Sequence, residues 1–100
     1  MEKHKIILSP AAQRDFVDVA RHINVLPPEE AAEYAGQLLT EVEKLQTSPT
    51  SCPFAKDSHL RLRGYRVLTV GEYMLFFVVN GKNVQIRRIL SAKRQYDRLV

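Results

Sequence analysis

Apolar residues in the first half of the chain recur at helical spacing, after one short strand-like run. Lys5–Leu8 (KIIL) is a compact apolar run that predicts a buried strand. Ser9 and Pro10 then mark a helix start, because a serine hydroxyl caps free N–H groups and proline at the first helical position has none to satisfy. We expect this helix to end near Asn24, before a Pro-Pro pair. Its apolar positions are Ala12, Phe16, Val19, Ala20 and Ile23.

A second helical pattern begins at Pro28 or Glu29. Acidic residues in its first turns, including Glu30 and Glu33, complement the positive end of the helix dipole. Two helices that are joined by a few residues and each carry one apolar face should pack as an antiparallel hairpin. The following segment, Thr47–Pro53, has the composition of a loop. The apolar stripe of the second helix consists of Ala31, Ala35, Leu38, Val42 and Leu45, widened by Tyr34 and Leu39.

The pattern changes to a strand-like one in the second half. Tyr65–Val70 and Tyr73–Val79 are rich in β-branched and aromatic residues and flank a tight-turn candidate, Gly71–Glu72. Asn80–Gly81 then precedes the apolar run Val84–Leu90. Asn-Gly between apolar runs favours a type I′ hairpin, in which both central residues have positive φ. These segments predict a three-stranded antiparallel meander.

Strict alternation along the last strand predicts two faces, with Val84, Ile86, Arg88 and Leu90 on one and Gln85, Arg87 and Ile89 on the other. The stretch Lys93–Val100 predicts one or two final helical turns. The expected fold is therefore α+β, of order β-α-α-β-β-β, with the helical hairpin on a mainly antiparallel four-stranded sheet. A chain of 100 residues has material for one hydrophobic core, so residues 1–100 should form a single domain.

Charge is divided unevenly between the two halves. Residues 1–50 hold five Lys/Arg and eight Asp/Glu, whereas residues 51–100 hold ten Lys/Arg and three Asp/Glu, giving net charges of −3 and +7. Such a basic half favours a polyanionic partner, either nucleic acid or an acidic protein segment, with a solvated basic face as the alternative. Seven arginines against three lysines in that half favour recognition, because guanidinium makes bidentate contacts with phosphate.

Other features of the sequence indicate the compartment and exclude some classes of protein. Cys52 is the one cysteine, so no internal disulfide can form, as is usual in a reducing compartment. No apolar run approaches the roughly 18 residues that span a bilayer, and the N-terminus lacks a signal-peptide pattern. We therefore expect a cytoplasmic protein without membrane association. His4, His22 and His59 lack metal-ligand spacing, and the sequence calls for neither a metal nor a cofactor.

Two segments that together frame almost the whole chain carry a family resemblance. Gly64–Val100 (GYRVLTVGEYMLFFVVNGKNVQIRRILSAKRQYDRLV) contains a basic strand, a tight turn, Tyr-x-Leu-x-Phe, a polar turn, Arg-Ile-Leu and a basic ending. Leu8–Ile23 (LSPAAQRDFVDVARHI) contains a strand end followed by a Ser-Pro-x-Ala helix start. In this order, and in a chain of this length, the segments are similar to the RelE/ParE superfamily of bacterial type II toxins.

This resemblance implies a toxin that causes growth arrest and is neutralised by a small cognate antitoxin encoded beside it, as in plasmid stabilisation modules. A toxin–antitoxin hetero-oligomer is expected. RelE-like members cut messenger RNA on the ribosome without a metal, whereas ParE-like members lack this activity and poison DNA gyrase. We expect a RelE-like endoribonuclease whose partners are the ribosome and mRNA. Gyrase inhibition is the alternative, and a non-toxic binding module is a third.

Metal-free RNA cleavage requires an activated 2′-hydroxyl, a stabilised phosphorane charge and a protonated leaving oxygen. By resemblance, Arg66 and Arg94 occupy positions of the family's basic residues that would stabilise this charge. Tyr96 or His59 would move the proton. RNA binding is expected from the remaining basic positions, which are Lys56, Arg61, Arg63, Arg87, Lys93 and Arg98.

Three positions favour other interpretations. Met74 stands where RelE-type nucleases can carry an arginine, and Ser91 stands where some relatives carry a histidine. Both departures favour the ParE-like alternative. Arg88 matches the arginine of the family's Arg-Ile-Leu segment, but its place on an apolar strand face predicts a half-buried structural residue. We expect it to pair with Asp15 or Asp18 of the first helix.

Overall fold

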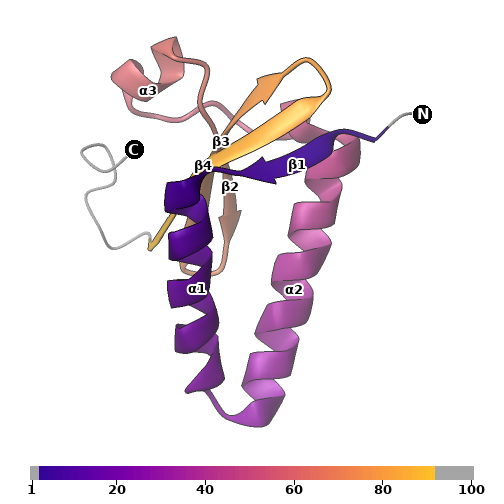
Figure 1. The fold of residues 1–100 in the computed structure, drawn as a ribbon, viewed down its shortest axis with the longest axis vertical. Helices are drawn as coiled ribbons and strands as arrows, with labels where there is room; N and C mark the ends of the chain where they lie inside the picture. The colour runs from indigo at the N-terminus through magenta and orange to yellow at the C-terminus, as the bar shows by residue number, and fades with distance from the viewer. Residues whose placement is uncertain (1–2, 92–100) are drawn as a thin grey trace.

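The computed structural model describes residues 3–91, in which the predicted strands and helices follow the predicted order (Figure 1). The elements are β1 (Lys5–Leu8), α1 (Pro10–Asn24), α2 (Pro28–Thr47), the 3-10 turn η1 (Pro49–Ser51), α3 (Ser58–Leu62), β2 (Arg66–Val70), β3 (Tyr73–Asn80) and β4 (Asn83–Ser91). The sheet order is β1-β4-β3-β2, with β1 parallel to β4 and the other pairs antiparallel. The α+β prediction is confirmed, and the helical turns predicted for Lys93–Val100 lie outside the described residues.

Ser9 fixes the start of α1 to the sheet. Its Oγ accepts a hydrogen bond from Ala12 N at 3.0 Å, and Pro10 follows in the first turn, as predicted. The same hydroxyl donates to Arg87 O on β4 at 2.8 Å. The helix therefore begins where the β1–β4 pair ends. Within residues 3–91, no helix is both long and apolar enough to span a membrane.

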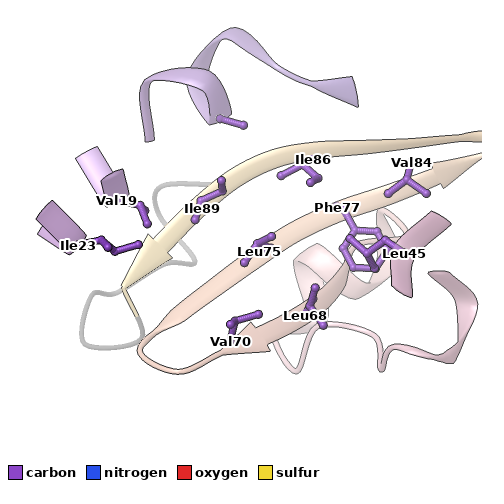
Figure 2. Packing of buried hydrophobic residues seen from close by; sticks show 11 residues of the cluster. Val19, Ile23, Leu45, Leu68, Val70, Leu75, Phe77, Val84, Ile86 and Ile89 are labelled. Carbon is purple, nitrogen blue, oxygen red and sulfur yellow. The ribbon is translucent and has the colours of Figure 1, made fainter. Parts of the chain in front are cut away.

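The two long helices bury the main core against one face of the sheet, and Figure 2 shows the side chains of that core. Leu45 of α2 and Phe77 of β3 are almost fully buried there, and Val19 and Ile23 bring α1 onto the same core. Burying a side chain of this size stabilises the fold by about 1.5–3 kcal/mol relative to leaving it exposed. The hairpin is thus held mainly by apolar contact with the strands.

The opposite face of the sheet carries a second, smaller core. It includes Leu60 of α3, which is fully buried, and Phe76 of β3. The helix α3 was not predicted from the sequence. Asp57 caps it by accepting a hydrogen bond from Leu60 N at 3.1 Å. A five-residue helix is too short to show an apolar period, so the capping aspartate was its one sequence signal.

Both hairpin turns place a glycine with positive φ at their first central position. Gly71, with φ of 57°, connects β2 and β3 as predicted. In the next turn the central residues are Gly81 and Lys82, with φ of 61° at the glycine, while Asn80 pairs with Asn83 at the strand ends. The predicted type I′ turn centred on Asn-Gly is therefore wrong. A single positive φ at the first central residue is the pattern of a type II′ turn.

β4 departs from strict alternation at a bulge. Phe76 of β3 pairs with Arg88, and the next residue of β3 pairs with Ile86, so Arg87 is the extra residue. One extra residue reverses which face each later side chain occupies. Ile89 therefore joins Ile86 in the core under the helices, and the predicted alternation beyond Ile86 is wrong.

Tyr34 of α2 fastens the β2–β3 turn to the hairpin. Its hydroxyl donates to Val70 O at 3.2 Å and accepts from Glu72 N at 3.0 Å. The ring lies so close to Gly71 that a Cβ at that position would collide with the hydroxyl group. Glycine is required there both by its positive φ and by this close approach.

Candidate functional site

Arg66, at the start of β2, is held by the loop that precedes it. Its Nη1 donates to Cys52 O at 2.7 Å and to Thr50 O at 3.1 Å. Its Cζ lies 3.9 Å from the centre of the Phe54 ring, and Phe54 also forms an antiparallel bridge with Arg66. Guanidinium over an aromatic face is a favourable cation–π contact. These interactions give Arg66 a structural role in closing the loop onto the edge of the sheet.

Exposed basic side chains gather on the segment around α3. Lys56, Arg61 and Arg63 are all exposed, because other residues of the segment turn inward onto the second core. Leu62, between the two arginines, is 87% exposed. These four residues are called the α3 patch below. His59, on the same helix, is exposed as well. The α3 patch therefore offers positive charge and apolar surface together.

Arg87 lies on a different part of the sheet, in β4. It is the exposed extra residue of the β4 bulge, and its Nη2 donates to Gln85 Oε1 at 3.0 Å. Its carbonyl is the acceptor for Ser9 at the start of α1. Along the sheet β4 borders β1, whereas the α3 patch immediately precedes β2 at the opposite edge. The structure thus brings the three predicted basic residues of the α3 patch onto one segment and presents Arg87 from another.

Four predicted site residues lie beyond Ser91 and outside the described part of the chain, namely Lys93, Arg94, Tyr96 and Arg98. Two of them belong to the predicted catalytic set of Arg66, Arg94 and Tyr96. Arg66 is the member of that set for which the structure gives contacts.

Arg88 pairs with Asp15, which confirms its predicted structural role. Its Nε donates to Asp15 Oδ2 at 2.6 Å, and its Nη2 donates to Oδ1 at 3.1 Å. The backbone N–H of Ile89 also donates to Oδ2, at 3.0 Å. The hydrogen bond to Asp15 raises the pKa of Arg88, although burial opposes the rise. This arginine joins α1 to β4 and is only 22% exposed.

The lone cysteine does not have the environment of a nucleophile. Burial raises the pKa of the Cys52 thiol, Arg66 opposes that rise and Glu41 adds to it. Only the thiolate form is nucleophilic, so a raised pKa leaves the thiol largely unreactive at neutral pH. Across residues 3–91, no group of three or more His, Cys, Asp and Glu side chains could hold a metal ion.

The sequence analysis did not predict that two apolar side chains beside the basic residues would be exposed. Phe54 is 47% exposed under the Arg66 guanidinium, and Leu62 is 87% exposed within the α3 patch. The available signal for Leu62 was its position between two arginines, outside any apolar stripe. Phe54 carried no comparable signal, because its contact with Arg66 depends on how the loop folds back.

Several solved structures resemble this chain. The chromosomal ParDE toxin–antitoxin system of P. aeruginosa matches with a TM-score of 0.66 and 23% identity, over 88% of this chain and 95% of that one. A RelBE toxin–antitoxin complex of Mycobacterium tuberculosis matches at 0.58 and 19%, over 91% and 93%. The RelB–RelE complex of Methanococcus jannaschii matches at 0.57 and 20%, over 94% and 99%. At these identities the likeness shows the fold.

The family follows from the sequence. A search of curated protein sequences found no match. The model of the ParE toxin of type II toxin–antitoxin systems, however, matches residues 6–96, which is nearly the entire chain. The chain therefore belongs to the ParE toxin family of type II toxin–antitoxin systems, within the RelE/ParE superfamily.

Proposed function

We propose that this toxin acts by binding DNA gyrase, as the ParE-like branch does, and not by cutting messenger RNA. The observation that carries the proposal is the engagement of Arg66 by two loop carbonyls and the Phe54 ring. An arginine that stabilises a transition state must direct its donors at the reacting phosphate. The match to the ParE toxin model supports the same choice, as do Met74 and Ser91.

The α3 patch supports a toxin that works by binding. Leu60 anchors the short helix α3 to the second core, and both Arg61 on this helix and Arg63, its C-cap residue, are exposed. Protein interfaces combine apolar anchors with arginine, and Leu62 between the two arginines provides both. We propose the α3 patch as the part of the described surface that meets the acidic surface of the target.

A ribosome-dependent endoribonuclease is the second candidate function. It is favoured by the basic α3 patch, by the exposed Arg87 and by the structural likeness to RelE-containing complexes. In that case Arg94 would stabilise phosphate charge and Tyr96 would move a proton, with Lys93 and Arg98 among the residues that hold the RNA.

The partner common to both candidates is a cognate antitoxin. The solved relatives named above are toxin–antitoxin systems, which supports such a partner for this chain. We propose that an acidic segment of the antitoxin covers the exposed cations, forming a hetero-oligomer with the toxin. Both candidate targets, gyrase and the ribosome, place the protein in the cytoplasm.

Cell-free translation separates the two candidates. Purified, antitoxin-free protein is added to a translating message, and the ends of that message are mapped. A gyrase-binding toxin leaves the message intact and translation unimpaired. Cuts that form only while ribosomes translate would contradict the proposal. Their loss in Arg94→Ala and Tyr96→Phe variants would then assign the nuclease chemistry to those residues.

A further inference from the structure

The loop Ala55–Tyr65, which carries α3, is closed by hydrogen bonds at its base. Ala55 N donates to Tyr65 O at 2.9 Å, and Tyr65 N donates to Leu60 O at 3.1 Å. All three residues are buried in the second core, and Asp57 caps α3 from within the loop. A loop that is already fixed loses little further conformational freedom when it binds a partner. The loop is therefore a firm support for the side chains on its outer surface.

Leu62 is the most exposed large apolar side chain in the described part of the chain, at 87%. Leu60, two residues earlier, is fully buried. Successive residues of a helix project about 100° apart, so Leu62 lies on nearly the opposite side of α3 from Leu60. Arg61 and Arg63 are exposed on either side of it. The loop thus holds one apolar side chain in solvent between two arginines.

Positive charge dominates the surface around Leu62. Between Glu43 and Glu72 the sequence contains one acidic residue, Asp57, and its carboxylate accepts the capping hydrogen bond of α3. Lys56 and the two arginines are all exposed over this stretch. Such a surface fits a partner that offers dense negative charge directly beside apolar surface.

Double-stranded DNA has this combination. It carries one negative charge per about 1.7 Å of helix axis, and the faces of its stacked bases are apolar. Proteins that bind the minor groove contact it through arginine and lysine and insert an apolar wedge between two base pairs, which kinks the duplex by about 20–90°. Arg61, Leu62 and Arg63 supply these parts in the order that the groove requires, with the wedge between the cations. The closed loop supplies the rigidity that a wedge needs to separate stacked bases.

We propose that the α3 patch binds the minor groove of double-stranded DNA. Leu62 is the wedge between base pairs, and Arg61 and Arg63 contact the phosphates that flank it. Gyrase acts on double-stranded DNA, so the proposed target is a complex of protein and DNA in which the phosphates form the most acidic surface. The inference rests on the proposed function in this respect alone, because DNA binding by the patch is measured without gyrase.

The arginines are tested through the salt dependence of DNA binding. The affinity of purified, antitoxin-free protein for a short fluorescent duplex is measured by anisotropy at several salt concentrations. Arg61→Ala combined with Arg63→Ala should weaken binding at least about tenfold at low salt and reduce the slope of log K against log salt by about two. Arg14→Ala combined with Arg21→Ala removes the same charge from exposed positions of α1 and is the matched control.

The control should bind within about threefold of wild type, because charges far from the duplex are screened by salt. Equal losses of affinity in the two double variants would overturn the proposal. All of these substitutions change exposed side chains, so circular dichroism should show the same fold throughout.

Leu62 is tested through the shape of the duplex. Energy transfer between dyes on the two ends of the duplex reports a bend. Wild type should bend a duplex with a central TA step more than an A-tract, because TA steps unstack easily and A-tracts are stiff. Leu62→Ala should abolish the bend and leave the salt slope unchanged, since it removes the wedge and no charge. A bend that persists in Leu62→Ala would overturn the proposal.

Competition identifies the class of macromolecule. Unlabelled duplex DNA should displace the fluorescent duplex at a lower concentration than single-stranded RNA of the same sequence does. Tighter binding of the RNA would overturn the proposal and favour the endoribonuclease. A wild type that binds neither, but binds gyrase protein through Leu62, would also overturn it and make the α3 patch a protein contact.

Failure of this inference and failure of the proposed target give different results. If wild type inhibits supercoiling but binds no duplex, gyrase remains the target and the α3 patch is not a DNA site. If wild type binds and bends the duplex as described but leaves supercoiling undiminished, the DNA site stands and gyrase is lost as the target.

Discussion

Asp15 joins the first helix to the last strand through both side-chain and backbone contacts. Its carboxylate accepts from the Arg88 guanidinium and from the N–H of Ile89, at a point where β4 has no β1 residue beside it. The side chain is only 12% exposed, so water cannot easily replace these partners. One helix residue thus accepts hydrogen bonds from both a guanidinium and a strand N–H.

Removing this carboxylate should destabilise the protein. We expect Asp15→Ala to lower the free energy of unfolding by about 2–3 kcal/mol, because it strips partly buried donors of a charged acceptor. Asp18→Ala is the control, since Asp18 is highly exposed and weakly paired, and should change little. Urea denaturation of the two variants measures the difference. Equal losses would show that the Asp15 contacts contribute no more than a surface charge.

The two turn glycines provide a matched pair of substitutions. Gly71 and Gly81 have nearly the same positive φ, but a Cβ at Gly71 meets the Tyr34 ring whereas at Gly81 it meets open space. Gly81→Ala should therefore cost about 1–2 kcal/mol for the backbone conformation alone. Gly71→Ala should cost clearly more. Thermal unfolding of both variants tests this order, and an equal cost would mean that Tyr34 moves aside freely.

At the scale of elements, the two long helices and most strand bounds followed from local signals. The Ser-Pro start of α1, the Pro-Pro break and the β-branched and aromatic residues of β3 are all local signals in the sequence. The bulge at Arg87 did not follow, because it depends on which β3 residue each β4 residue faces. The short α3 and the type II′ turn were missed for a related reason. α3 is too short to show an apolar period, and at the turn the Asn-Gly pair was a stronger local signal than Gly81 and Lys82.

The candidate site was less predictable than the elements. The pairing of Arg88 with a helix acid was correctly expected, since a charge on an apolar strand face needs a partner. The engagement of Arg66 was not, because its acceptors are loop carbonyls and every residue has a carbonyl. The family resemblance placed Arg66 in a catalytic set by position alone. Its hydrogen bonds to Thr50 and Cys52 tie it to the loop.

At the scale of the whole molecule, the chain presents two surfaces of different chemistry. The basic second half contributes the α3 patch, beyond the face of the sheet that the helices leave free. The first half contributes an apolar groove between the two long helices, which Phe16 and Leu39 help to line. Division of charge between the halves was visible in the sequence. The groove was not, because Phe16 and Leu39 belong to stripes that predicted full burial in the core.

The gyrase binding proposed for this toxin can be measured through the supercoiling of plasmid DNA. Relaxed plasmid is treated with purified gyrase and ATP while purified, antitoxin-free protein is added at rising concentration. We predict that supercoiling falls with dose and is preserved when the antitoxin is mixed with the toxin first. If the protein arrests growth when expressed but leaves supercoiling undiminished at a large molar excess, gyrase is not its target.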